Sequence, residues 1–173
     1  SAVINAMTVH LIPALTDRAF STTAAALAVT GLTLTSILSR VGCGRLADTF
    51  DARYIIAACF VSMAAGLAVL TFVSGPLLIP LFILAFFPAY GGVIPLRSQM
   101  LVDYYGRKAF PLLQGVFLMV TTIGGTLGPV FAGWVFDVSG SYTIAFVTFI
   151  ALSIVGIPLI LAVQPPRGGP TGK

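Results

Sequence analysis

The sequence predicts an all-α integral membrane protein, and three observations lead to this fold class. The chain of 173 residues is 58% hydrophobic and 8% charged, and it contains no Glu. A soluble domain carries about 25% charged residues, so this chain has too few polar groups to cover its surface in water. Charge-free windows of the length needed to cross ~30 Å of hydrocarbon also recur along the sequence. We therefore expect helices that span a lipid bilayer.

Five windows are long enough to be complete transmembrane helices. They are residues 19–39, 54–73, 76–96, 109–136 and 142–163. Ser21, Thr22 and Thr23 form a predicted cap signal at the start of the first window. The dipeptide at 74–75 predicts a tight turn, with Pro76 at the start of the third window. Pro165 and the proline after it end the last window.

Residues 1–15 are apolar but too short to cross a membrane. We expect them to be the end of a further span, so that the chain is a piece of a longer protein. The predicted organisation is one transmembrane bundle over residues 1–165 followed by a tail over residues 166–173.

The basic residues predict the orientation of the bundle. The loops 41–53 and 97–108, the C-terminal tail and Arg40 together hold eight of the nine Lys and Arg residues. Arg18 is the one basic residue on the other side, where we interpret Asp17 and Arg18 as an exposed pair of little energetic weight. Cytoplasmic loops carry an excess of Lys and Arg. The C-terminus and its side are therefore predicted to be cytoplasmic.

Composition and motifs argue against several other functions. The net charge of +4 does not indicate nucleic-acid binding, because the basic residues are scattered between apolar runs. Cys43 and Cys59 lack metal-ligand spacing and are interpreted as packing residues. The sequence has no nucleophile–base pair, metal-ligand cluster or phosphate-binding loop, so we expect no enzymatic activity and no cofactor.

Glycines and prolines are frequent inside two of the windows. Gly124 and Gly128 are four residues apart, a spacing that lets helix backbones approach closely in lipid. Pro88 and Gly91 belong to a similar set in residues 76–96. These residues are compatible with fixed helix packing, and equally with helices that slide and bend during function.

Three motifs in order resemble the major facilitator superfamily. The sequence GRLAD at residues 44–48, followed by Asp51 and Arg53, resembles the signature loop between helices two and three and between helices eight and nine. DYYGR at 103–107 and GGTLGP at 124–129 resemble the loop before helix eleven and helix eleven itself. The resemblance implies the C-terminal half of such a carrier: the end of helix seven and five complete helices, without the N-terminal bundle.

The loop motif has an implied role and a local one. The resemblance implies that Gly44, Arg45, Asp48 and Arg53 latch the two halves of the carrier in one conformation. The residues themselves predict a tight helix exit at Gly42 and Gly44, with Asp48 capping a helix N-terminus. A solvated loop with an N-cap is the alternative interpretation.

A narrower resemblance is to the monocarboxylate transporter and oxalate/formate antiporter branch. Ser39, Arg40, Gly44, Ala47 and Asp48 match the pattern at the end of helix eight in that branch. The sequence VHLIPALTDRAFS at 9–21 is similar to bacterial members, which implies a bacterial inner-membrane protein.

Two departures from that branch bear on the substrate. Ser36 stands where monocarboxylate carriers have an Asp, and no Lys occurs in residues 110–136, where the antiporters use one for dicarboxylates. A doubly charged substrate is therefore disfavoured.

Arg40 is the main candidate for substrate binding. An Arg at the centre of a membrane helix costs ~2.5–3.5 kcal/mol on insertion scales, so it usually faces a cavity or a partner. Thr33 and Ser36 lie at helical spacing from it and predict one polar face. A guanidinium binds a carboxylate with two parallel hydrogen bonds. The alternative is that Arg40 extends to the membrane interface as an anchor; the family resemblance favours the substrate role.

The remaining candidates are polar residues inside apolar segments. His10 is the one group in the predicted spans whose charge could change near neutral pH. It is a candidate for proton coupling, or it forms a hydrogen bond within the wall. Asn5, Tyr90, Thr122 and Thr126 are candidates for lining the cavity, or for purely structural roles.

The predicted function is secondary active transport of a small organic anion, most simply a monocarboxylate, by alternating access. Its partners are the anion, the lipid bilayer, the absent N-terminal bundle and, in a symporter, protons; antiport fits as well. Two other functions stay open. One is a carrier of the same fold that exports uncharged or cationic compounds such as drugs, and the other is a membrane scaffold or sensor that transports nothing.

Overall fold

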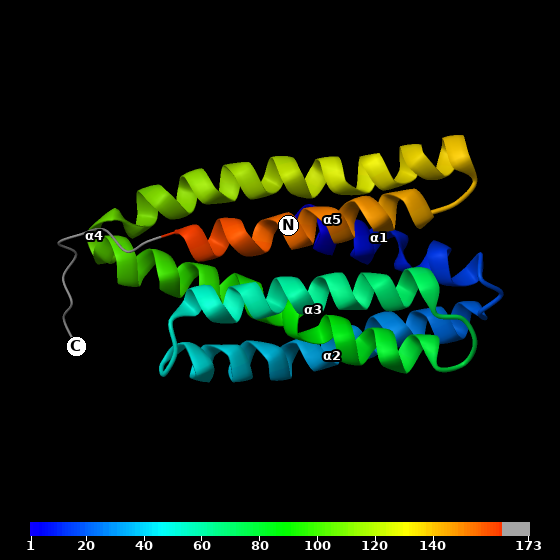
Figure 1. Cartoon of the computed structure of the whole chain (residues 1–173), viewed down its shortest axis with the longest axis horizontal. Helices are drawn as coiled ribbons and strands as arrows, with labels where there is room; N and C mark the ends of the chain where they lie inside the picture. Colours follow the sequence, from blue (N-terminus) through cyan, green and yellow to red (C-terminus); the bar gives the residue numbers. More distant parts are fainter. Residues whose placement is uncertain (164–173) are drawn as a thin grey trace.

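Residues 1–163 form five helical elements that run up and down an elongated bundle (Figure 1). The structure is a computed structural model that describes residues 1–163. The helices are α1 (Ala2–Thr16), α2 (Thr22–Ala47), α3 (Ala52–Phe72), α4 (Leu78–Ser139) and α5 (Thr143–Ala162). No strand occurs in the described part of the chain, and the predicted all-α fold is confirmed.

Element α4 consists of two antiparallel helices. Its 62 residues fold back at Gly106, whose backbone (φ 76°, ψ 165°) is not helical. Glycine adopts this positive φ without the steric cost that a side chain brings. Figure 1 shows the two arms running in opposite directions. We call residues 78–105 the first arm of α4 and residues 107–139 the second arm.

The five predicted spans are present in the structure. Four helices, α2 to α5, are long and apolar enough to cross a membrane, and α4 supplies two spans through its two arms. Helix α1 is apolar but shorter. Its N-terminus lies near the middle of the bundle's length (Figure 1), as expected of a segment that does not cross by itself.

The loops at one end of the bundle are shorter than predicted. Helix α2 continues through Gly42 and Gly44 to Ala47, and the first arm of α4 continues to the break at Gly106. The predicted helix exit at the two glycines and the predicted loop 97–108 are therefore wrong. A backbone amide without a partner in lipid costs several kcal/mol, whereas a glycine inside a helix costs about 1 kcal/mol. Continuing the helix is the cheaper solution.

Several glycines allow close helix packing. Element α4 packs against α1, α2 and α3, and α3 packs against α5. A Cβ atom at Gly91 would collide with the backbone of α2, and one at Gly128 would collide with the backbone of α1. Gly125 also faces α1, whereas Gly124 has open space around it. The contact positions in the second arm are thus Gly125 and Gly128 rather than the predicted pair.

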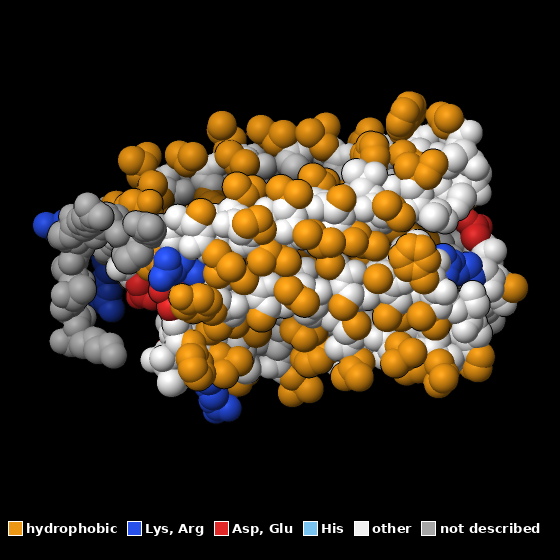
Figure 2. All heavy atoms as spheres, viewed as in Figure 1, with side chains coloured by type: hydrophobic (Ala, Val, Ile, Leu, Met, Phe, Trp, Pro, Cys, Tyr) orange, Lys and Arg blue, Asp and Glu red, His pale blue; other side chains and the backbone are white. Residues whose placement is uncertain are grey.

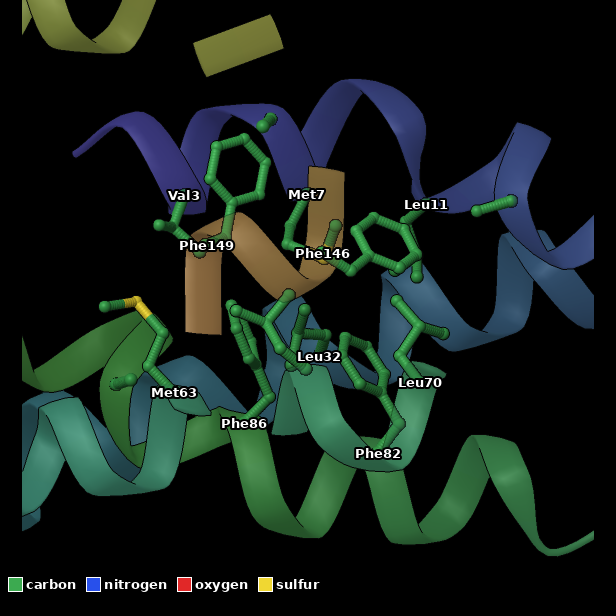
Figure 3. Close-up of a cluster of buried hydrophobic side chains, with 14 of the residues drawn as sticks. Val3, Met7, Leu11, Leu32, Met63, Leu70, Phe82, Phe86, Phe146 and Phe149 are labelled. Atoms are coloured by element: carbon green, nitrogen blue, oxygen red, sulfur yellow. The ribbon is translucent and has the colours of Figure 1, made fainter. Parts of the chain in front are cut away.

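An aromatic core joins the helices (Figure 3). Phe82 and Phe86 of the first arm stack with ring centroids 5.2 Å apart. Phe146 and Phe149 of α5 are buried in the same cluster, together with Met7 of α1. Large buried aromatic side chains contribute much of the packing energy of a core, so this cluster fixes how α1, α4 and α5 sit together.

The surface separates charged ends from an apolar flank. Figure 2 shows hydrophobic side chains along the bundle and charged side chains gathered at its two ends. Leu112 and Phe72 are 74% and 72% exposed, as expected for side chains that contact lipid. We call the end that holds Asp51 and Gly106 the Asp51 end, and the opposite end the Arg18 end. The chain is an integral membrane protein with several spans.

Candidate functional site

Arg40 lies inside a helix rather than at its edge. Helix α2 extends to Ala47, and the exposed side chains next to Arg40 include Leu38 and Val41, at 68% and 50% exposure. Arg40 itself is exposed. Within residues 1–163 its guanidinium takes part in no ion pair. The site therefore combines a permanent positive charge with an apolar helix surface.

Two hydroxyl groups precede Arg40 on α2 but bond to their own helix. Thr33 is exposed, and its Oγ1 donates to the carbonyl of Val29 at 2.8 Å. Ser36 is 4% exposed, and its Oγ donates to the carbonyl of Thr33 at 2.6 Å. Because Ser36 packs against the first arm of α4, the exposed side of the predicted polar face consists of Thr33 and Arg40.

Ser39 fixes α2 to the first arm of α4, a role that the sequence did not reveal. Its Oγ donates to the carbonyl of Pro88 at 2.8 Å. The thiol of Cys59 in α3 points to the same carbonyl at 3.5 Å. Polar side chains from neighbouring helices often satisfy the backbone near a proline in a membrane helix. This junction of three helices adjoins Arg40 and limits how α2 can turn.

His10 connects α1, the second arm of α4 and α5. Its Nδ1 lies 3.2 Å from the hydroxyl of Tyr142, and its Nε2 lies 3.0 Å from the carbonyl oxygen of Pro129. A carbonyl oxygen only accepts hydrogen bonds, so Nε2 carries a hydrogen and the neutral ring accepts at Nδ1. Gly133 of the second arm lies beside the ring, where an added Cβ atom would make an ordinary contact 3.6 Å from the imidazole.

The other predicted cavity residues are dispersed over the bundle. Asn5 packs against Gly125 of the second arm, and the hydroxyl of Thr122 donates to the carbonyl of Leu118 at 2.8 Å. Tyr90 is half-buried in the first arm, with its ring centroid 6.3 Å from that of Phe86. No hydrogen bond among the described residues joins these side chains to Arg40.

A charged cluster ties three helices together at the Asp51 end. Arg53 donates from Nε and Nη2 to Asp51 Oδ2 at 3.0 and 2.8 Å. Its Nη1 donates to the carbonyl of Val163, after α5, at 2.8 Å. The hydroxyl of Tyr104 donates to Asp51 Oδ1 at 3.2 Å. Burial raises the pKa of Asp51, but the hydrogen bonds and charge of Arg53 outweigh it and hold the pKa below its ordinary value.

The cap of α3 is Asp51, not Asp48 as predicted. Asp51 accepts from the backbone N–H of Arg53 at 3.0 Å. Asp48 is exposed at the C-terminal cap of α2, because that helix runs beyond the two glycines. Arg45 is exposed in the last turn of α2, and Gly44 is half-buried. Of the four predicted latch residues, Arg53 is the one held in the cluster.

Arg18 has a structural role at the opposite end. Its Nη1 and Nη2 donate to the carbonyls of Val73 and Thr71, at 3.2 and 3.1 Å, where α3 ends. A cation near a helix C-terminus is stabilised by the carbonyl groups left without partners there. No ion pair with Asp17 is formed among the described residues. The predicted exposed pair is therefore wrong, and Arg18 joins α3 to the α1–α2 connection.

Arg97 lies between the two arms of α4, whereas the sequence had placed it in a loop. Its guanidinium carbon is 4.2 Å from the ring centroid of Phe117 in the second arm. The Nε of Arg97 and the Oε1 of Gln114 are buried and have no hydrogen-bond partner within residues 1–163. The helical continuation of the first arm brings this charge against an aromatic ring.

One pocket of about 170 Å³ opens at the Arg18 end, away from Arg40. Asp17, Arg18, Ser141 and Thr143 contribute polar groups to its wall, and Tyr142 separates it from His10. In the described part of the chain, no three His, Cys or Asp side chains gather as metal ligands.

Comparison with known proteins agrees with this architecture. Residues 1–173 match the sequence profile of the Major Facilitator Superfamily. The chain belongs to the major facilitator superfamily. Within this superfamily, 83 residues of the chain (48% of it) are 31% identical to monocarboxylate transporter 14 of Mus musculus and 29% identical to monocarboxylate transporter 14 of Homo sapiens. The matched segment covers 15% and 16% of those two proteins.

Proposed function

We propose that the protein containing this chain is a secondary transporter of a small monocarboxylate that works by alternating access. The chain forms the C-terminal bundle, and a second bundle forms the opposite wall of the substrate cavity. Membership of the major facilitator superfamily supports transport of a small molecule across the membrane. The partial similarity to monocarboxylate transporter 14 of two mammals supports a carboxylate as the substrate.

The observation that carries this proposal is the environment of Arg40. A guanidinium inside an apolar helix needs a partner or a water-filled cavity, and Arg40 has no ion-pair partner within residues 1–163. Ser36, one turn earlier, is buried and uncharged, and its hydroxyl donates to the carbonyl of Thr33 within α2. A substrate carboxylate can accept two parallel hydrogen bonds from Arg40. In the alternative role, Arg40 anchors α2 at the membrane interface and does not bind substrate. The transport experiment below distinguishes the two roles.

The other candidate residues take supporting roles in this proposal. Thr33 lies two helical turns before Arg40 on the exposed side of α2. Asn5, His10, Tyr90 and Thr122 line the cavity, together with Ser36 where the helices part. Gly44, Arg45, Asp48 and Arg53 form the latch at the Asp51 end, which we place on the cytoplasmic side of a bacterial inner membrane. The coupling is proton symport, because a bound proton compensates the charge of the anion in lipid.

The test uses the intact protein in proteoliposomes and measures uptake of radiolabelled acetate and lactate under an outside-acid pH gradient. The variants are Arg40→Gln and Arg40→Lys, with Arg107→Gln as the matched control because Arg107 is exposed at the Asp51 end. Leaving a bound carboxylate without its cation costs about 2–5 kcal/mol, or about 30-fold or more in affinity. We expect Arg40→Gln to abolish saturable uptake, Arg40→Lys to retain part of it and Arg107→Gln to resemble the wild type.

Three results would contradict the proposal. Carboxylate uptake that is unaffected by Arg40→Gln would indicate that Arg40 is an interface anchor. Transport of cationic or neutral drugs without carboxylate uptake would indicate an exporter. No flux of any substrate under any gradient would support a scaffold or sensor.

A further inference from the structure

The bonding of His10 defines where the imidazole can take up a proton. Because Nε2–H donates to the carbonyl of Pro129 at 3.0 Å, the free lone pair of the ring is on Nδ1. The group in contact with Nδ1 is the hydroxyl of Tyr142, at 3.2 Å. A proton that reaches this lone pair therefore passes through the phenol oxygen or displaces it.

Tyr142 stands between His10 and the pocket at the Arg18 end. The side chain is 8% exposed, and it forms part of the wall of the pocket of about 170 Å³. A water molecule occupies about 30 Å³ of liquid and needs polar partners. Asp17, Arg18 and Ser141 supply such partners, so the pocket can hold several water molecules in contact with bulk solvent.

The charges around this point favour the arrival of a proton. Asp17 at the end of α1 and Asp137 in the second arm of α4 both place negative charge near Tyr142. Arg18 also lines the pocket, but its guanidinium is held by the carbonyls at the end of α3. Tyr142 is the group that α5 places against His10. Tyr142, the contact of the imidazole, is therefore near two carboxylates and one cation that already bonds to backbone carbonyls.

We propose that the pocket, Tyr142 and His10 form a proton path from the Arg18 end of the bundle into the transporter. The path deepens the proposed function and rests on it, because it assigns the route of the coupled proton. A hydronium ion in the pocket gives a proton to the phenol oxygen, while the original O–H proton moves to Nδ1 of His10. The hydronium ion and the phenol each lose one O–H bond, a new phenol O–H bond and the N–H bond form, and a water molecule and a neutral phenol remain.

The product of this transfer is stabilised where it forms. The imidazolium has two N–H donors, and each already faces an acceptor, the phenol oxygen at Nδ1 and the Pro129 carbonyl at Nε2. The protonated ring bridges α1, α5 and the second arm of α4. Charging His10 therefore acts on the contact between α1 and α4, where Gly125 and Gly128 bring the two helices together.

The variant that tests the path is Tyr142→Phe in the intact protein. It removes the hydroxyl and keeps the ring, which stacks on Phe136 and Phe146 at centroid distances of 4.4 and 5.7 Å. His10→Gln is the second variant. Tyr105→Phe is the matched control, because Tyr105 is 49% exposed at the other end of the bundle. Thermal stability of each purified variant checks that the fold is retained.

Two fluxes are measured in the same proteoliposomes. One is net lactate uptake driven by an outside-acid pH gradient, with proton entry followed by an internal pH dye. The other is lactate–lactate exchange at equal pH, which needs no net proton transfer. We expect Tyr142→Phe to lower net uptake and proton flux about tenfold or more, with exchange within about twofold of the wild type. His10→Gln is expected to abolish the response of net uptake to external pH.

The outcomes separate this path from the proposed function. If wild-type net uptake does not depend on the pH gradient, or if Tyr142→Phe keeps wild-type proton flux, the path is wrong while carboxylate transport stands. An equal loss of net uptake and exchange in Tyr142→Phe would also overturn it, since the tyrosine would then be structural. If the wild type moves no carboxylate at all, the proposed function fails first.

Discussion

Replacing Gly66 by alanine is a direct test of the packing that holds α3 against α4. Gly66 is buried where α3 crosses the first arm of α4. A Cβ atom there would lie 2.7 Å from Phe86 Cβ, 2.8 Å from Cδ2 and 3.0 Å from Cα. Carbon atoms in favourable contact are about 3.5–4.0 Å apart. The two helices must therefore separate by about 1 Å at this point or bend around it.

The expected cost follows from overpacking. Extra methyl groups in a well-packed core cost about 1–3 kcal/mol, and alanine recovers at most about 1 kcal/mol through its helix propensity. Gly66→Ala is thus expected to destabilise the protein by about 1–2 kcal/mol. At about 2–4 °C per kcal/mol for a chain of this size, the midpoint of thermal unfolding should fall by about 2–8 °C. Gly124→Ala is the matched control, because no atom lies within 4 Å of the added Cβ.

Two buried cysteines give a direct signal for the assay. Cys59 and Cys43 are 2% and 7% exposed and form no disulfide, so a thiol-reactive fluorogenic dye should label them only as the bundle opens. The purified protein is heated with the dye in detergent, and Gly66→Ala is compared with Gly124→Ala and the wild type. The control should unfold at the wild-type temperature or slightly above it.

The reasoning would be refuted if Gly66→Ala unfolded at or above the temperature of the control. A second result bears on the same geometry. Phe86 Cα and Cβ, two of the three nearest atoms, remain when Phe86 is shortened to alanine. Shortening Phe86 should therefore not rescue Gly66→Ala, and full rescue would show that the collision lies in the ring and not in the approach of the backbones.

Two further predictions concern the ends of the bundle. Arg18→Gln should lower the free energy of unfolding by up to about 2 kcal/mol, because the side chain no longer carries the positive charge that bonds the carbonyls at the end of α3. The midpoint of thermal unfolding should therefore fall. An unchanged midpoint in the same dye assay would contradict the capping role. Because the pKa of Asp51 is lowered in the folded protein, its carboxylate stabilises the folded state above the ordinary carboxyl pKa of 3.8. This stabilisation is lost as the pH falls further and the carboxylate is protonated. Asp51→Asn should reduce stability at pH 7 and flatten its decline between about pH 5 and pH 2, and a decline as steep as in the wild type would place the acid-sensitive group elsewhere.

The spans were predictable because they depend on composition and length. A run of about 20 apolar residues can satisfy its backbone in lipid only as a helix, whatever the rest of the chain does. A helix cap within residues 21–23 was predictable for a similar reason, and Ser21 supplies it: its Oγ accepts from the N–H of Ala24, three residues later, at 3.2 Å. Both features are local in sequence.

The helix ends and the partners of the charged residues were not predictable in this way. Gly42 and Gly44 suggested a helix exit, but Cys43 between them is buried. The packing of Cys43 and the helical hydrogen bonds together outweigh the low helix propensity of the two glycines. His10 bonds to residues 119 and 132 positions away. Arg18 bonds to the end of α3, 53 and 55 positions away. No local sequence pattern predicts hydrogen bonds between residues so far apart along the chain.

The partners of the other arginines support the proposal that Arg40 binds the substrate anion. Arg18 and Arg53 reach the carbonyls where α3 and α5 end, and Arg53 also holds a carboxylate. Arg97 covers the face of an aromatic ring. These three charges have protein partners, and Arg45 is exposed near a helix end. Arg40 differs because it is set in an apolar stretch of α2 and no described side chain neutralises it. A charge in that position is costly, and under the proposed function a substrate carboxylate bound to Arg40 would offset that cost.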